Sequence, residues 1–340
     1  MADERELIER VARAIPSIQR GKEQKQGIAL GIGDDAAVIR SARKRDWVVT
    51  VDAFVEDVHF LRDKHPADAV GYKALARATS DLAAMGARPD FFLLSLALPS
   101  DCTRTWLNLF AKGMGRAARK LGLVLVGGDT TRSASISISV TVIGHAQRFG
   151  TKAPVVSRSG ARAGALLYVS GPLGRAQLGL ELVLQDYANN RKLQKLLAPH
   201  LYPAIRLQLG EWLASRGIAS AMIDISDGLS TDLARLCSAS RVGARIYAER
   251  IPVVQIPSPV AGLLGRRAAD PLSMALHGGD DYELLFAVPK KLERKLAGAP
   301  DFQNLKCVGE IEPTMGVRLI EPDGQVRHLL AKGWDSFRRA

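Results

Sequence analysis

The 340-residue sequence has little cysteine and no apolar run long enough to cross a bilayer. Its three cysteines, Cys102, Cys237 and Cys307, are widely separated and form no CxxC pair, which argues against a disulfide framework and a zinc finger. The first residues, MADERELIERVARAI, lack the apolar centre of a signal peptide. We therefore expect a cytoplasmic protein with reduced thiols and no contact with a membrane.

The common nucleotide-binding and catalytic motifs are also missing. The sequence contains no GxxxxGK[ST], no protein-kinase HRD or DFG set and no HExxH, and none of its six histidines stands in a triad-like context. Residues 113–118, GMGRAA, imitate a dinucleotide fingerprint, but they lie in a helical pattern with no strand before them. We interpret these small residues as helix-packing positions, and the absences argue against a P-loop and against acyl transfer.

Acidic residues are outnumbered by basic ones, 35 against 47, which gives a formal net charge of +12. Such a charge can attract nucleic acid. The basic residues are dispersed, however, and the one cluster, RSARKR at 40–45, has no interleaved aromatic residue of the kind that binds single strands. We expect no nucleic-acid partner, since a basic surface also suits small substrates that carry phosphate.

The chain length and a hydrophobic fraction of 47% predict two globular domains. Strand-like and helix-like segments alternate in both halves, which predicts a mixed α/β fold. Residues 66–87 are expected to form a helix with Pro66 in its first turn and Gly86 at its end, and residues 103–122 a second one. Because residues 147–165 show weak periodicity, we predict domains at 1–150 and 151–340.

Aspartates follow several apolar runs, as in LGIGDDAAVI, VVTVDAF, LVLVGGD and AMIDISD. One Gly-Asp pair is by default a turn. For the set, we expect acids that end strands, at the edge where open α/β sheets bind ligands. Carboxylates beside so much apolar surface are costly without a cation, and short hard carboxylates suit Mg²⁺. The pattern therefore favours a magnesium site over coincidence.

Two further acids fit this interpretation. Asp81 lies late in the helix 66–87, where the helix dipole disfavours an acid, among small apolar neighbours that offer no cation. Asp227 in IDISDGLSTDL stands where a helix N-cap is expected, before Gly228, and free amides there could receive phosphate. Capping alone would leave Asp224 unexplained.

Phosphoryl transfer fits such a cluster of acids, because its catalysis consists mainly of positioning and charge neutralisation. A phosphate acceptor, with a second pKa of about 6, is already ionised near neutral pH and needs no general base. No obvious general base occurs in these motifs.

These motifs together resemble the thiamine-monophosphate kinase family, within the superfamily of aminoimidazole ribonucleotide synthetase. The resemblance runs in order from LGIGDDAAV through VDAFVEDVHF, YKALARATSDLAAMGARP, VGGDTTRS, SRSGARAG, IDISDGLSTDL and GGDDYELLF to KGWDSF. It implies ATP- and Mg²⁺-dependent phosphorylation of thiamine monophosphate to thiamine diphosphate. It also implies a homodimer paired through N-terminal sheets, with which the alternating SASISISVTV strand is compatible, and a C-terminal α/β sandwich.

The resemblance assigns site residues by motif. The implied metal ligands are Asp34, Asp35, Thr50, Val51 (through its carbonyl), Asp52, Asp81, Asp129, Asp224 and Asp227. The implied ATP contacts are Gly128, Asp129, Arg158 and Ser226, and the implied substrate contacts are His59, Asp280 and Trp334. An aromatic ring and an acid suit a cationic thiazolium. The family usually has Glu where this chain has Asp280, and an acid where ARAGALL has none; neither departure touches the metal set.

Other readings remain open. Selenophosphate synthetases would need a reactive residue near the N-terminus, whereas the first cysteine is Cys102, and the hydrogenase-maturation relative ends in a functional cysteine, whereas this chain ends SFRRA. Aminoimidazole ribonucleotide synthetase differs at GGDTTRS. A non-catalytic binder of nucleotide or nucleic acid would show affinity that falls steeply with salt and no ADP release.

Overall fold

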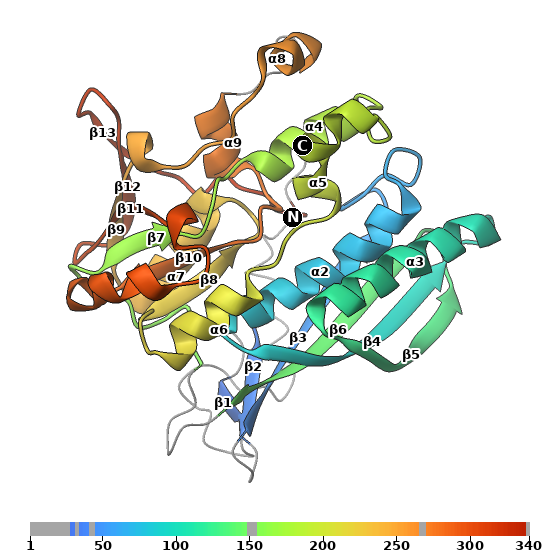
Figure 1. The fold of residues 1–340 in the computed structure, drawn as a ribbon, viewed down its shortest axis with the longest axis horizontal. Coiled ribbons are helices and arrows are strands. Elements are labelled where there is room, and N and C mark those ends of the chain that lie inside the picture. The colour runs from blue at the N-terminus through green and yellow to red at the C-terminus, as the bar shows by residue number, and fades with distance from the viewer. Residues whose placement is uncertain (1–27, 31–33, 41–44, 148–154, 265–269, 338–340) are drawn as a thin grey trace.

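The computed structural model describes residues 28–30, 34–40, 45–147, 155–264 and 270–337. The N-terminal segment, most of the basic cluster at 40–45 and the expected boundary at 150 lie outside these ranges. The described strands form two sheets joined by helices, with one sheet in each half of the chain (Figure 1). The predicted mixed α/β fold is confirmed, and the 150/151 boundary stays a prediction.

The first sheet has six strands. In spatial order they are β1 (Ile28–Leu30), β2 (Ala37–Arg40), β3 (Arg45–Val55), β6 (Ser137–Gln147), β4 (Arg88–Leu98) and β5 (Val124–Arg132). All neighbours are antiparallel except β4 and β5, which are parallel.

Strand β6 shows why this sheet has one covered face. Its alternating sequence buries Ile138, Val140 and Val142 almost completely. Helices α2 (Ala67–Met85) and α3 (Arg104–Leu121) lie over that face (Figure 1).

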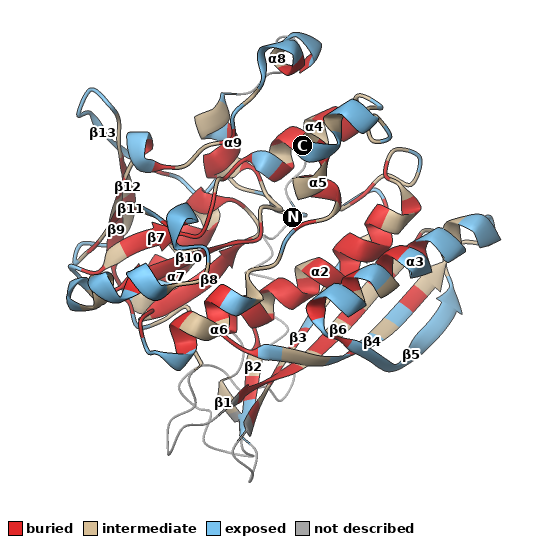
Figure 2. Ribbon diagram, viewed as in Figure 1, coloured by how far each residue is buried: buried red, intermediate tan, exposed pale blue. Residues whose placement is uncertain are grey.

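The opposite face of this sheet carries exposed apolar side chains, and β5 is exposed along its whole length (Figure 2). These side chains are Val51, Phe91, Leu93 and Val124. We call them the bare sheet face.

The second sheet has seven strands and is covered on both faces. In spatial order they are β13 (Val326–His328), β12 (Gly316–Ile320), β9 (Gly243–Tyr247), β11 (Lys306–Glu312), β7 (Leu166–Val169), β10 (Glu283–Val288) and β8 (Ala221–Ile225). In β10, Leu285 and Ala287 join the core under α7 (Leu229–Ser240), whereas Leu284 and Phe286 join the core under α6 (Leu207–Ser215). Burial on both faces makes this half the expected α/β sandwich.

The other helices in the described ranges cover the second sheet or connect its strands. They are α4 (Arg175–Leu184), α5 (Gln194–Leu201), α8 (Ser258–Leu264) and α9 (Pro271–His277), with short 3₁₀ helices at Arg191–Leu193, Ala248–Arg250, Lys290–Gly298 and Phe302–Asn304. In the described ranges, no helix combines the length and the apolar character that spanning a membrane requires.

The ends of α2 and α3 follow their sequence signals. Pro66 precedes α2, and Gly86 ends it in the left-handed conformation at φ 69°. Thr103 caps α3 by accepting a hydrogen bond from the Trp106 amide, and Gly122 ends it. Both predicted helices are confirmed. Gly113, in the fingerprint-like segment, lies inside α3, as predicted.

Candidate active site

Helix α2 lies between the two halves, in contact with β3 and β6 of the first sheet and with β8 and α6 of the second half. Lys73, Arg77 and Asp81 are spaced four residues apart on it, so they form one row along a single helix face. The site is built around this row.

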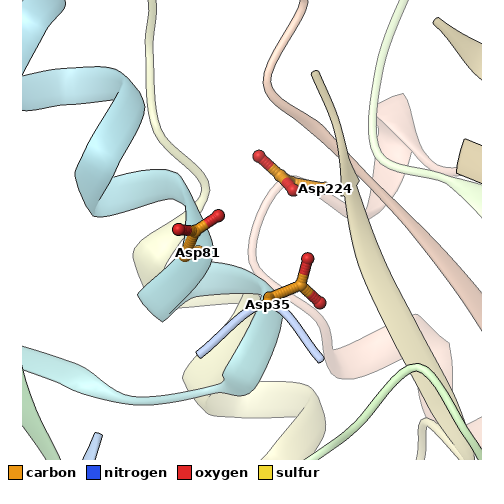
Figure 3. Close-up of side chains that lie close together, drawn as sticks. All are labelled: Asp35, Asp81 and Asp224. Carbon is orange, nitrogen blue, oxygen red and sulfur yellow. The ribbon is translucent and has the colours of Figure 1, made fainter. Parts of the chain in front are cut away.

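Asp81, at the C-terminal end of the row, meets two acids from distant parts of the chain. Asp35 comes from the loop before β2 and Asp224 from β8, and one carboxylate oxygen of each of the three lies within 4.8 Å of the others (Figure 3). We call Asp35, Asp81 and Asp224 the carboxylate cluster.

Burial dominates the electrostatics of this cluster. Burial, and then the neighbouring Asp224 and Asp35, raise the pKa of Asp81 well above its usual value. Burial and Asp35 also raise the pKa of Asp224, to about 7. The anionic form of both carboxyl groups is therefore unfavourable in the protein alone.

Among the described residues, the cluster has one cationic partner. Arg158 donates to Asp35 at 2.6 Å, and neither Asp81 nor Asp224 forms an ion pair with a lysine or arginine in the described part of the chain. The Asp35 Oδ2 atom is buried and accepts no hydrogen bond from a described residue. Three carboxylates against one guanidinium leave excess negative charge and free oxygen donors, which suits a hard divalent cation.

The other acids around the row each have a cation of their own. Asp52 in β3 pairs with Arg77 at 2.8 Å, Asp227 with Arg235 at 2.5 Å, and Asp280 with Lys73 at 2.7 Å. Burial acts to raise the pKa of Asp280, but Lys73 and other neighbours hold it well below its usual range. Each of these acids therefore has a cationic partner in the protein itself, although burial still raises the pKa of Asp52.

Strand β3 explains the placement of Thr50 and Val51. Successive side chains point to opposite faces, so Thr50 and Asp52 point toward α2, whereas the Val51 side chain is 64% exposed on the bare sheet face. The Thr50 hydroxyl donates to Asp81 at 2.5 Å. Only the main chain of Val51 could contribute a ligand to a site on the face of β3 that points toward α2.

Asp34 and Arg158 lie beside the cluster. Asp34 Oδ1 accepts hydrogen bonds from the main-chain amides of Arg158 and Asp35, at 3.0 and 3.2 Å. The loop carrying Arg158 is thereby tied to the loop carrying Asp34 and Asp35.

The prediction that Asp227 is an N-cap is wrong. Helix α7 begins after Gly228, and the amides of Ser226 and Asp227 both donate to Asp232 Oδ2, at 3.1 and 3.0 Å. The buried Asp232 closes this turn, so those amides are not free for phosphate, and the Asp227 carboxylate is left to point toward Arg235.

The three predicted substrate contacts lie next to this turn and next to α2. The Asp280 amide donates to the Ser226 carbonyl at 2.8 Å, and the Trp334 amide to the Asp227 carbonyl at 2.9 Å, so both residues are anchored to the same loop. The Trp334 side chain is 50% exposed. Burial lowers the pKa of His59 to about 4, and its Nδ1 accepts a hydrogen bond from the Val55 amide, so its ring is neutral near pH 7.

Gly128 and Asp129 do not join the cluster. They lie in the exposed edge strand β5, three strands away from β3 in the sheet. Gly128 has a packing role, because a Cβ atom there would lie 1.8 Å from the Leu94 carbonyl oxygen. The expectation that the acids end their strands is wrong for Asp52 and Asp129, since β3 and β5 continue beyond them. It holds for Asp224 and Asp227, which lie at and just beyond the end of β8.

Comparisons with known proteins give the family of this chain. The family models for AIR synthase related protein match residues 33–146 (N-terminal domain) and 162–320 (C-terminal domain). The thiamine-monophosphate kinase of Buchnera aphidicola is 36% identical over 83% of this chain and 84% of its own, and that of Escherichia coli K12 is 35% identical over 94% and 95%. This chain belongs to the thiamine-monophosphate kinase family.

A solved structure supports the same membership. AaThiL complexed with AMPPCP and TMP is 31% identical to this chain and superposes with a TM-score of 0.81, covering 98% of this chain and 97% of its own.

In this thiamine-monophosphate kinase family member, three basic side chains at the site were not predicted from the sequence. They are Lys73, Arg77 and Arg235. The expectation that the face of Asp81 offers no cation is wrong, because Arg77 stands one turn before it. The spacing of residues 73, 77 and 81 could have revealed the row. It could not have revealed that Arg77 pairs with Asp52 instead of Asp81.

Proposed function

We propose that this protein transfers the γ-phosphate of ATP to thiamine monophosphate (TMP), giving thiamine diphosphate and ADP, with Mg²⁺. Family membership supports the reaction, since the curated relatives are thiamine-monophosphate kinases and the AaThiL structure carries AMPPCP together with TMP. The observation that carries the proposal is the carboxylate cluster, whose excess negative charge requires a cation and whose oxygens suit Mg²⁺.

In the reaction, a terminal oxygen of the TMP phosphate forms a bond to the γ-phosphorus, and the bond from this phosphorus to the bridging oxygen of ADP breaks. The electron pair of that bond stays on ADP. The attacking oxygen is already ionised near neutral pH, so no proton has to be removed. This agrees with a site in which the His59 ring is neutral and accepts a hydrogen bond from the main-chain amide of Val55. Bound Mg²⁺ would neutralise the phosphate oxygens.

The cluster residues and Asp52, Asp227, Asp34 and Thr50 are the proposed metal-binding side chains, with the Val51 carbonyl beside them. Asp52 and Asp227 would each exchange an arginine partner for a metal ion, since each is paired with an arginine in the protein alone. Arg158 and Ser226 are the proposed nucleotide contacts, because Arg158 pairs with Asp35 of the cluster and Ser226 follows Asp224 by two residues.

His59, Asp280 and Trp334 are the proposed TMP contacts. Lys73 already neutralises Asp280, so the attraction that this acid can offer a cationic thiazolium is reduced. The half-exposed Trp334 ring is then the main candidate for a cation–π contact.

We also propose that two copies pair through the bare sheet face. It gathers four exposed apolar side chains from β3, β4 and β5, the kind of patch that marks an interface. Gly128 and Asp129 lie on the edge strand β5. Pairing of two copies would therefore place them near the active site of the second copy instead of the active site of their own chain. We further propose that the protein is cytoplasmic and that it has no nucleic-acid partner.

The deciding experiment measures ADP release with TMP, with thiamine and with no acceptor, in Mg²⁺ and in excess EDTA. We expect ADP release that depends on TMP and Mg²⁺ and a stoichiometric yield of thiamine diphosphate. Asp224→Asn should lower turnover by at least about a thousand-fold through loss of charge stabilisation. Asp186→Asn, in an exposed pair with Lys64, is the matched control and should remain active. TMP-independent ADP release would contradict the proposal.

A further inference from the structure

The proposed reaction places the TMP phosphate between the carboxylate cluster and the proposed TMP contacts, and Arg77 is located at that junction. We infer that Arg77 is a substrate-binding residue whose guanidinium contacts the phosphate of TMP. The inference rests on the proposed function and deepens it, because none of the residues assigned above to TMP supplies a cation for its phosphate.

The position of Arg77 is fixed by the row on α2. It stands one turn from Asp81 of the cluster and one turn from Lys73, the partner of Asp280. Its guanidinium interacts electrostatically with Asp52 and Asp227 among the proposed metal ligands, and with Asp280 and Tyr282 on the substrate side. It also lies close enough to His59 to lower the pKa of that ring. Arg77 therefore faces both halves of the proposed site.

The guanidinium has donors left for a ligand. Nε lies 2.8 Å from Asp52 Oδ2, Nη1 donates to the Ala53 carbonyl at 3.1 Å, and Nη2 donates to no described residue. The guanidinium lies over the Phe54 ring, at 5.2 Å from its centroid, which restricts its orientation.

Exposure separates Arg77 from its neighbour in the row. The Lys73 side chain is 2% exposed and committed to Asp280 and His200, so it cannot reach a substrate. The Arg77 side chain is 16% exposed, so part of it remains open to solvent.

The chemistry of the acceptor explains why a cation is needed here. A phosphate dianion entering between Asp52 and Asp280 meets two carboxylates, and repulsion between like charges at a few ångströms opposes binding. The planar fork of an arginine offsets this repulsion and gives phosphate two parallel hydrogen bonds, which also orients it. Thiamine has no phosphate and makes no such demand, so Arg77 would distinguish TMP from thiamine.

The test is calorimetric titration with TMP and with thiamine, in Mg²⁺ and AMPPCP so that no turnover occurs. In Arg77→Met we expect TMP affinity to fall at least about ten-fold while thiamine affinity changes less than about two-fold, as for loss of a charge-assisted hydrogen bond. Arg77→Lys keeps the charge without the fork and should lose at least about three-fold for TMP alone. Arg88→Met, which removes an arginine from the exposed pair with Glu211, should change neither affinity.

An unchanged ratio of TMP to thiamine affinity in folded Arg77→Met would overturn the inference. An equal loss for both ligands would also overturn it, because Arg77 would then serve only as the structural partner of Asp52. If Arg77→Met does not fold, the ratio in Arg77→Lys decides by the same criterion. A wild-type protein that binds no TMP and releases no TMP-dependent ADP would overturn the proposed function itself, which is a distinguishable result.

Discussion

Asp81 shows how a single residue of the proposed site lowers the stability of the protein on its own. Its carboxylate is half-buried beside Asp35 and Asp224 and accepts a hydrogen bond from the Thr50 hydroxyl, and no described lysine or arginine pairs with it. An arrangement of this kind is unfavourable without a bound cation, and it is retained where function needs it.

Asp81→Asn should therefore stabilise the metal-free protein, by on the order of 1 kcal/mol, because it removes one of three repelling charges and keeps an oxygen acceptor for Thr50. The same change should abolish the rise in melting temperature that Mg²⁺ produces in the wild type, together with turnover. Thermal unfolding with and without Mg²⁺ measures both effects, with Asp186→Asn as control. A variant that melts lower than wild type and still responds to Mg²⁺ would contradict this account of the cluster.

At the scale of elements, the row on α2 is held in place by close helix packing. Helices α2 and α3 cross where glycines replace larger side chains: a Cβ atom on Gly113 would lie 1.8 Å from the Asp68 carbonyl oxygen, and one on Gly71 2.0 Å from that of Phe110. Because the obstacles are backbone atoms, neither helix can yield without moving as a whole.

Gly113→Ala should therefore destabilise the protein by about 3 kcal/mol or more, as overpacking against backbone does. Gly115→Ala, two residues further along α3, is the matched control, since its Cβ atom would meet only the tip of Arg119 at 3.5 Å. It should be neutral or stabilising by up to about 1 kcal/mol, because alanine favours a helix over glycine. Urea unfolding of the two variants makes the comparison, and equal stability would show that the crossing is looser than described.

At the scale of the whole molecule, the two sheets differ in how they are covered. The second sheet buries both faces, whereas the first buries only the face under α2 and α3 and leaves the bare sheet face to solvent. Asp129 lies at the edge of that exposed region, apart from the carboxylate cluster of its own chain.

Complementation tests whether paired copies share sites. Asp129→Asn and Asp224→Asn should each be inactive as purified proteins. If Asp129 serves the site of a second copy, unfolding and refolding an equimolar mixture should restore about a quarter of wild-type activity, since half of the dimers are mixed and each has one intact site. Light scattering on the wild type should give twice the mass of one chain. No recovery in a mixture shown to contain mixed dimers would mean that Asp129 does not act across the interface.

The sequence by itself determined the local structure and the chemistry to expect. Pro66 and Gly86 set the ends of α2, Thr103 set the start of α3, and the alternation in β6 set its buried face, because these signals act through neighbours along the chain. The acid-rich motifs pointed to a cation and to phosphate for the same local reason: they interrupt apolar segments.

Only the tertiary structure decided which acids meet and which cation each acid keeps. Asp35, Asp81 and Asp224 are brought together by a loop, a helix and a strand from both halves, while Asp129 is carried to an outer edge. Arg77 pairs with Asp52 on β3 instead of Asp81 on its own helix, because helical periodicity fixes the face on which a side chain stands but not the partner that packs against that face.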